Sequence, residues 1–382
     1  MFPSTISPAA PSSRRIQTRK PERKAYIFAC LVLLVSSCMP LRAGPVAYTV
    51  VDLGALTGGT AGVGNGISET GYVVGRYTDS SGNVHGFLYD GTIHDIGSSQ
   101  YDFRANGVNA AGQVTGYYSV DNSGNAVSYL YDGTIHNIGG LGGSNTSAQA
   151  INSSGVIVGG SLNAGGVLHP FRYDGSMHDD IGTLGGTNAQ ALGINAAGVI
   201  VGDSQIAGDA AIHPFFWDGT IHDIGTFGGN FGDAIGINDA GLVVGRASYS
   251  NGDLHAFLYD GTLHDLGTLG GCSVAFDINS SGLAVGYSSF LPCNQNVLRA
   301  VRYSLTTGIE DLNNLIAPGS GWILYEAAAI NDAGQIAGTG FINGEQHAIR
   351  LDPITAVPEP ATLLLLSCAL GLGWAAKHRK MF

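Results

Sequence analysis

Histidine is the residue of this sequence whose type and spacing could most readily support chemistry. Ten of the eleven histidines fall into two recurring sets. The first set is His85, His169, His213, His255 and His347, and the second is His94, His136, His178, His222 and His264. A metal centre needs three or four ligands at one point, whereas equivalent positions of separate repeats are held apart. We therefore predict structural histidines and no metal site, with Phe257 facing His264 across a hairpin.

Aspartate and asparagine also recur, and paired carboxylates could perform acid–base chemistry. The aspartates that precede a glycine are Asp90, Asp132, Asp174, Asp218 and Asp260. Asp-Gly is a preferred hairpin turn because both residues tolerate positive φ. A second turn begins with Asn109, Asn152, Asn195, Asn238, Asn279 or Asn331. Glycine-rich segments such as 269–271 lack the lysine and the helix of a phosphate-binding loop. We therefore predict no catalytic residue and no cofactor, although a structural calcium ion stays open.

These residues recur because nearly the whole chain repeats one unit, which residues 237–271 show clearly. The unit contains four short extended runs joined by turns at Asn238 to Gly241, at Asn251-Gly252 and at Asp260-Gly261. The glycine that closes the first turn recurs as Gly71, Gly112, Gly155, Gly198, Gly241, Gly282 and Gly334. A period of about 43 residues with four strands is typical of a β-propeller blade rather than a solenoid coil. The sequence therefore predicts an all-β, seven-bladed β-propeller.

The two ends of the repeat array predict how the ring closes. Residues 48–54 match the fourth strand of a unit, and residues 347–352 match a third strand that has no fourth strand after it. Pairing of Val50–Leu53 with Ala348–Leu351 would complete the last blade and remove two open sheet edges.

Charge is distributed unevenly along the chain. Residues 44–360 contain seven arginines, no lysine and 28 Asp and Glu residues, a difference of −21. Nucleic acids and anionic membranes bind through clustered Lys and Arg, so this region is not predicted to bind either. An acidic surface suits a soluble exported protein or contact with cations.

The N-terminal segment has the layout of a secretory signal peptide. Six basic residues between Arg14 and Lys24 precede the apolar run Tyr26–Val35. We predict a signal peptide over residues 1–43, cut after Ala43. Lipidation at Cys38, which ends a lipoprotein-like box, is the alternative.

The C-terminal segment, residues 357–382, contains Pro358-Glu359-Pro360, the apolar run Ala361–Ala376 and a basic tail with Arg379. This order resembles the PEP-CTERM sorting signal of Gram-negative bacteria. The resemblance implies a transient inner-membrane helix, cleavage by an exosortase-type transpeptidase, and delivery to the cell surface or the extracellular polysaccharide matrix.

The repeats of residues 44–356 carry a second resemblance. His255-Ala256-Phe257 and its relatives at 169–171 and 213–215 resemble the HAF-repeat family of mostly extracellular bacterial proteins. Units two and six lack the histidine at the equivalent positions, 127–129 and 298–300. The resemblance implies export but no particular chemistry.

Residues that break the repeat are the best candidates for binding, because variable loops on a rigid scaffold often carry function. Unit seven has a longer first loop with Trp322 and Tyr325, which could stack on a sugar; a plug at the ring seam is the alternative for Trp322. Cys272 and Cys293 lie in loops expected on one face, so we predict a disulfide between them in an oxidising compartment.

Together these features predict an exported, non-enzymatic binding or structural module that associates with extracellular polysaccharide. The alternative is a polysaccharide lyase or hydrolase with its site in the propeller channel.

Overall fold

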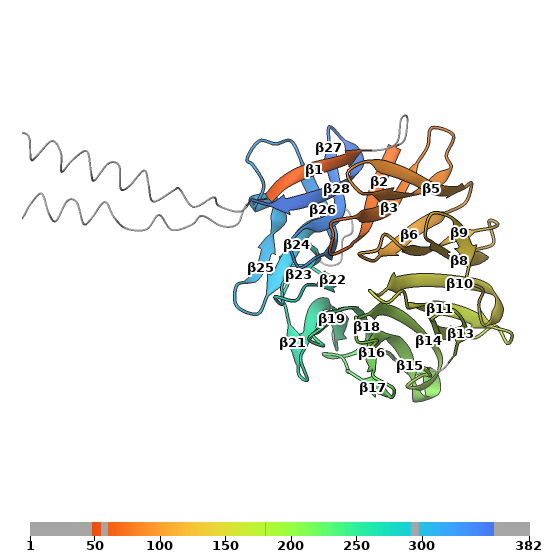
Figure 1. Cartoon of the computed structure of the whole chain (residues 1–382). Helices are drawn as coiled ribbons and strands as arrows, with labels where there is room; N and C mark the ends of the chain where they lie inside the picture. Colours follow the sequence, from red (N-terminus) through yellow and green to blue (C-terminus); the bar gives the residue numbers. More distant parts are fainter. Residues whose placement is uncertain (1–47, 55–59, 180, 292–297, 355–382) are drawn as a thin grey trace, which may run out of the picture. The chain divides into compact units, whose positions relative to one another are not determined.

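The computed structural model describes residues 48–54, 60–179, 181–291 and 298–354, which all lie in one compact unit, Pro45–Phe382. These residues form β-strands almost throughout, and each sequence repeat folds as successive antiparallel strands (Figure 1). The predicted N-terminal signal and C-terminal sorting segments lie outside the described residues.

The strands occupy four positions within the repeat. The first strands are β2 (Thr60–Ile67), β6 (Phe103–Val108), β10 (Gly142–Ile151), β14 (Gly185–Ile194), β18 (Gly228–Ile237), β22 (Ser273–Ile278) and β26 (Ile323–Ile330). The second strands are β3 (Val73–Thr78), β7 (Val114–Ser119), β11 (Ile157–Asn163), β15 (Ile200–Ile206), β19 (Val243–Tyr249), β23 (Ala284–Ser289) and β27 (Ile336–Ile342). The third strands are β4 (Val84–Tyr89), β8 (Ala126–Tyr131), β12 (Leu168–Tyr173), β16 (Ile212–Trp217), β20 (Leu254–Tyr259), β24 (Leu298–Ser304) and β28 (Glu345–Pro353). The fourth strands are β5 (Ile93–Ser99), β9 (Ile135–Asn137), β13 (Met177–His178), β17 (Ile221–Asp223), β21 (Leu263–Asp265) and β25 (Gly308–Asp311). Two short 3-10 helices, η1 (Ala207–Asp209) and η3 (Leu312–Asn314), lie in loops.

The described strands form six sheets. Five of the sheets have four strands each, and the sixth has eight. The larger sheet consists of two four-stranded antiparallel groups, joined where β16 meets β18 through the single parallel pair Ile212 and Phe231.

The strand β1 (Tyr48–Gly54) takes the fourth position beside β28, more than 290 residues away in sequence. Val50 is opposite Leu351, and Asp52 is opposite Ile349. The pairing predicted for Val50–Leu53 with Ala348–Leu351 is therefore present, and β1 covers the edge that β28 would otherwise expose.

A glycine in each second strand lets the strands approach closely. A Cβ at Gly245 would collide with the Asp233 carbonyl of β18. Phe257, which is opposite Gly245, is fully buried, and so are its equivalents Phe87, Phe171 and Phe215. The phenylalanine of the His-Ala-Phe pattern is thus a core residue, packed over a glycine.

The apolar core lies between successive units. Val158 of β11 packs in one cluster with Ala191, Ile200 and Phe215 of the following unit. Burial of each such large side chain stabilises the fold by roughly 1.5–3 kcal/mol, so every unit depends on its neighbours.

The register of the Asp-Gly hairpins differs from our prediction. Phe257 lies opposite Asp265, and His264 lies opposite Leu258. The turn has three residues rather than two, because the Asp260 N–H donates to the Thr262 carbonyl at 3.4 Å. The predicted pair of Phe257 and His264 is therefore wrong by one residue. Among the described histidines of this second set, only His222 faces an aromatic ring directly across the hairpin, Phe216, with centroids 4.5 Å apart.

Candidate functional site

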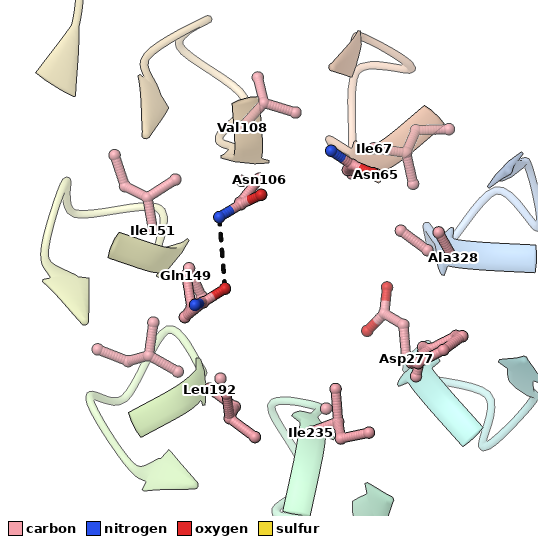
Figure 2. Close-up of a pocket in the computed structure, with 18 of the residues that line it drawn as sticks. Asn65, Ile67, Asn106, Val108, Gln149, Ile151, Leu192, Ile235, Asp277 and Ala328 are labelled. Atoms are coloured by element: carbon pink, nitrogen blue, oxygen red, sulfur yellow. Dashed lines mark hydrogen bonds between the residues drawn. The ribbon is translucent and has the colours of Figure 1, made fainter. Parts of the chain in front are cut away.

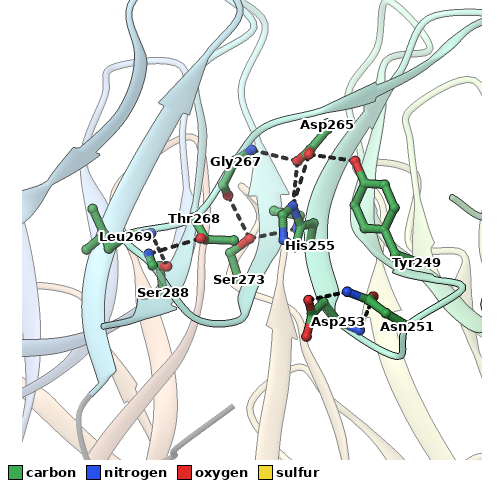
Figure 3. Close-up of polar contacts among 12 residues, drawn as sticks. Tyr249, Asn251, Asp253, His255, Asp265, Gly267, Thr268, Leu269, Ser273 and Ser288 are labelled. Atoms are coloured by element: carbon green, nitrogen blue, oxygen red, sulfur yellow. Dashed lines mark hydrogen bonds and ion pairs between the residues drawn. The ribbon is translucent and has the colours of Figure 1, made fainter. Parts of the chain in front are cut away.

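The first set of histidines forms a recurring contact with aspartate at the outer edge of the units. The Nδ1 atom of His255 lies 2.9 Å from an Asp265 carboxylate oxygen, and Asp265 also accepts from the Tyr249 hydroxyl at 2.8 Å and from the Gly267 N–H at 2.7 Å (Figure 3). The equivalent pairs are His85 with Asp95, His169 with Asp179, His213 with Asp223, and His347 with Asp52. In the last pair, the aspartate comes from β1. These histidines fasten the third strand to the fourth strand.

The second set of histidines contacts the aspartate that begins each hairpin. The Nε2 atom of His264 lies 2.9 Å from Asp260, and this hydrogen bond lowers the pKa of the Asp260 carboxyl. The same contact recurs for His94, His136, His178 and His222. Within the described ranges, no three His, Cys, Asp or Glu residues are grouped so that they could hold a metal ion.

The turn asparagines have a second role that was not predicted from the sequence. The Asn238 Oδ1 atom accepts from the Ala240 and Leu242 N–H groups and so holds the turn. Its Nδ2 atom donates to the carbonyl of Asn279, which begins the same turn in the next unit, at 2.9 Å. This inter-unit bond recurs from Asn109 to Asn152, Asn152 to Asn195, Asn195 to Asn238, Asn279 to Asn331, and Asn331 to Ser68. The last bond joins the seventh unit to the first.

The first strands and these turns surround a central channel. Two cavities, of about 350 and 240 Å³, share the lining residues Ile67, Val108, Ile151, Ile194, Ile237 and Asp277, so they are successive parts of one channel. The asparagine turns line one part. The other part is lined by residues one or two positions before the shared isoleucine or valine (Figure 2).

The wall of the larger cavity differs from unit to unit. Asn65, Asn106 and Gln149 give the first three units an amide wall, whereas Leu192, Ile235, Phe276 and Ala328 give the others an apolar wall. Because these seven side chains occupy equivalent positions, the repeat breaks its symmetry here.

Two carboxyl groups also line this cavity. Asp277 replaces the glycine or alanine of other units and accepts from the Ile278 and Ile330 N–H groups, both at 2.9 Å. Burial raises the pKa of Asp277 to about 7. Burial also raises the pKa of Glu326, and Arg76 acts in the opposite direction. Within the described part of the chain, no hydrogen bond or ion pair to the Glu326 carboxylate is present.

A second set of residues that differ between units occupies the position directly after the recurrent glycine of each second strand. Its residues are Arg76, Tyr117, Gly160, Asp203, Arg246, Tyr287 and Thr339. Arg76 pairs with Asp102 at 3.0 Å, and Arg104 contacts the other oxygen of that carboxylate at 2.8 Å. Arg246 pairs with Asp233 through two nitrogens at 2.9–3.1 Å. Each of the three arginines thus has a carboxylate partner, and Arg76 and Arg104 share that of Asp102.

Asp203 differs from the other charged residues of this set, because it forms no ion pair with any described residue, although the nearby Arg246 charge partly offsets the rise in its pKa that burial causes. Its Oδ1 atom accepts from the Gln190 side chain at 2.8 Å. Burial, with the neighbouring Asp233 charge, raises the pKa of Asp203 to about 7. This carboxyl group therefore titrates near neutral pH, where acid–base chemistry operates.

Trp322 and Tyr325 have different surroundings. Trp322 lines a separate groove with Tyr48, Val50 and Ile316, beside the seam between β1 and β28. Its indole meets the His347 ring edge-on, with centroids 5.7 Å apart. Tyr325 meets Phe341 edge-on and interacts electrostatically with Glu326. Tyr325 thus adjoins the channel residue Glu326, whereas Trp322 packs at the seam.

The remaining predicted residues lie wholly or partly outside the described ranges. Cys272 is disulfide-bonded and buried, but its predicted partner Cys293 lies outside the described residues. Pro358, Glu359, Pro360 and Arg379 also lie outside them. Among the described residues, no helix has the length and apolarity needed to cross a membrane.

The channel residues carry a signal in the sequence that the prediction of a binding site did not use. Each side chain stands two residues before the recurrent isoleucine or valine that ends the first strand. This position varies in chemistry inside an otherwise repeated strand. The predicted binding residues came from the variable loops instead.

Comparison with known proteins identifies the architecture. No family model and no curated protein sequence matches the chain. Among solved structures, the β-propeller domain of the Trilobed protease from Pyrococcus furiosus matches with a TM-score of 0.53 and 10% identity, covering 78% of this chain and all of that domain. The fold is a β-propeller. The Aleuria aurantia lectin in complex with α-methyl-L-fucoside is also similar, with a TM-score of 0.39, 13% identity and coverage of 70% of this chain and 96% of the lectin.

Proposed function

We propose that this propeller is a closed ring of seven blades and acts outside the cell as a non-enzymatic binding module for extracellular polysaccharide. Three contacts support closure. They are the pairing of β1 with β28, the bond from Asn331 to Ser68, and the contact between His347 and Asp52. Each contact joins the last unit to the start of the array.

One observation carries the binding role. The residues that recur between units hold turns, strands and neighbouring units together, whereas the residues that differ converge on the central channel. The channel combines an amide wall with an apolar wall, and ligand sites typically combine apolar surface with a few placed polar groups. A sugar presents both kinds of surface.

The extracellular location rests on the sequence alone. A signal peptide over residues 1–43 and a PEP-CTERM-like segment over residues 357–382 would direct the protein through the inner membrane of a Gram-negative bacterium. An exosortase-type transpeptidase would then release it to the cell surface or the matrix. Fractionation of the producing cells, with and without Pro358→Ala and Glu359→Ala, tests this route.

Calorimetric titration of the purified protein with extracellular polysaccharide fractions, with and without calcium, tests binding. Leu192→Trp narrows the channel and is expected to abolish saturable binding, whereas Trp322→Ala alters only the seam. Loss of binding in the Trp322 variant alone would indicate that the ligand binds at the seam and not in the channel. No heat with any fraction, in a folded sample, would favour a purely structural role.

Asp203 favours a second candidate function, that of a polysaccharide lyase or hydrolase. Its carboxyl group titrates near neutral pH beside the Asp233 carboxylate, which Arg246 holds in place. Such a pair could supply an acid and a base. Release of new reducing or unsaturated sugar ends, lost in Asp203→Asn, would establish this activity in place of simple binding.

A further inference from the structure

The side chains that line the larger cavity offer more hydrogen-bond acceptors than donors. Its polar side chains are Asn65, Asn106, Gln149, Asp277 and Glu326. Among the described residues that line this cavity, none is a lysine, arginine, histidine, serine, threonine or tyrosine. Carboxylates only accept hydrogen bonds when ionised, so the side-chain donors here are amide N–H groups and any carboxyl group that is protonated.

Those amide donors are largely used between units. The Asn106 Nδ2 atom donates to the Ala148 carbonyl at 2.8 Å and to the Gln149 Oε1 atom at 3.3 Å, which uses both of its hydrogens (Figure 2). The Asn65 Nδ2 atom donates to the Ala105 carbonyl at 3.0 Å. No group in the described part of the chain donates to the Oδ1 atom of Asn65 or Asn106. The amide wall therefore presents the Oδ1 acceptors of Asn65 and Asn106, beside one remaining N–H each on Asn65 and Gln149.

Glu326 adds a carboxyl group that makes no hydrogen bond or ion pair with the described residues. The positive group acting on it, Arg76, is already paired with Asp102 at 3.0 Å. Removing a carboxylate from water without a partner costs several kcal/mol. A cationic ligand group beside Glu326 would recover more of that cost than a neutral hydroxyl donor, and an anionic group would add to it.

Two features favour an organic cation over a metal ion. The described residues contain no group of three or more metal-ligating side chains. Opposite the amide wall, Leu192, Ile235 and Phe276 offer apolar surface for a carbon skeleton, and an aromatic face also attracts cations.

We propose that the channel recognises a protonated primary amine, carried by a sugar unit of a partly deacetylated hexosamine glycan. The ammonium group lies against Glu326 and the carbonyl oxygens of Asn65 and Asn106, while the sugar ring covers the apolar wall. This assignment rests on the proposed glycan-binding function and specifies its ligand class. The acidic repeat region, with its charge of −21 over residues 44–360, also favours the approach of such a cation.

Titration calorimetry with three probes tests the assignment: a glucosamine tetramer, an N-acetylglucosamine tetramer and spermidine. We expect the glucosamine tetramer to bind at least tenfold more tightly than its acetylated form. Glu326→Gln should weaken that binding at least tenfold. Glu345→Gln removes the same charge from an exposed outer hairpin, where 82% of the side chain is accessible, and should change Kd less than twofold.

The alternative outcomes separate the two proposals. Equal binding of both tetramers would overturn the amine assignment and leave glycan binding intact. Spermidine binding that depends on Glu326, without tetramer binding, would support the amine site and contradict a glycan ligand. Equal losses in both charge variants would overturn the assignment, because they would indicate long-range attraction only. Unfolding curves for each variant establish that the fold is retained.

Discussion

The inter-unit asparagine bonds predict that Ser68 is a weak point between the first unit and the second. Ser68 occupies the position of the turn asparagines, is 3% exposed, and accepts from the Tyr72 N–H at 3.1 Å, as an asparagine Oδ1 would. Its hydroxyl bonds Thr70 and does not reach the Asn109 carbonyl. The first unit therefore lacks the bond that six other positions make.

Ser68→Asn is expected to supply that bond. One added hydrogen bond contributes about 0.5–1.5 kcal/mol to the free energy of unfolding, which corresponds to roughly 1–6 °C in Tm. Thr70 occupies the position of the smaller Ala240 in the turn that Asn238 begins. Ser68→Asn with Thr70→Ala therefore gives a turn that differs from residues 238–241 only at Glu69. The double variant should be the more stable of the two.

The matched control is the reverse change, Asn195→Ser, which places the first-unit residue in a complete position. It removes the bond to the Asn238 carbonyl, 3.1 Å long, and should lower the free energy of unfolding by about 1 kcal/mol or more. Guanidinium unfolding monitored by circular dichroism measures both changes. The reasoning fails if Asn195→Ser costs nothing, or if neither Ser68 variant gains stability while remaining folded.

Three further predictions concern the channel and the seam. Because burial raises the pKa of Asp277 from 3.8 to about 7, the folded state holds a proton that the unfolded state loses, so stability falls as pH rises from about 4 to 7. Between about pH 4 and 7, the free energy of unfolding of Asp277→Asn should rise relative to that of the wild type by up to about 4 kcal/mol, as measured by urea unfolding. A difference between the two proteins that does not change with pH would contradict this prediction. Asp233→Ala leaves Arg246 without its carboxylate partner and should lower the free energy of unfolding by about 3 kcal/mol in the same assay. Asp233→Asn should lower it by less. Trp322→Ala should lower stability by about 3 kcal/mol without changing glycan affinity; a lost affinity in a folded variant would refute this.

The architecture could be predicted because its signals are local and repeated. Gly241 has φ near 82°, as the predicted turn requires, and an equivalent glycine closes each turn. The register of the Asp-Gly hairpins was harder to predict from the sequence. Asp-Gly is compatible with two-residue and three-residue loops, and the choice depends on the bond between Asp260 and Thr262, which the sequence pattern does not specify.

The inter-unit contacts could not be predicted from local patterns. Asn238 satisfies every rule for a turn residue through its Oδ1 atom alone, so nothing in the sequence requires a partner for its Nδ2 atom. That partner, the Asn279 carbonyl, is supplied by the packing of one unit against the next. For Trp322 the irregular loop left two predictions open, a ligand platform and a plug at the seam. The structure places Trp322 in a groove beside Tyr48 at the seam.

The location of the asymmetric residues follows from the constraints on a repeated unit. The glycine at Gly245 recurs in every unit, and the position of Phe257 always holds a buried hydrophobic side chain, because each neighbouring unit packs against the same surface. A side chain such as Ile235 or Asn106 faces the channel, where a change in its size or polarity displaces no core neighbour. Seven copies of one unit can therefore diverge on the channel wall at little cost in packing. The residue two positions before the end of the first strand comes once from each unit, so a single substitution there alters the chemistry of one side only. An amide wall facing an apolar wall is the kind of site that such independent changes produce, and a channel with identical walls would have given us no reason to place a ligand there.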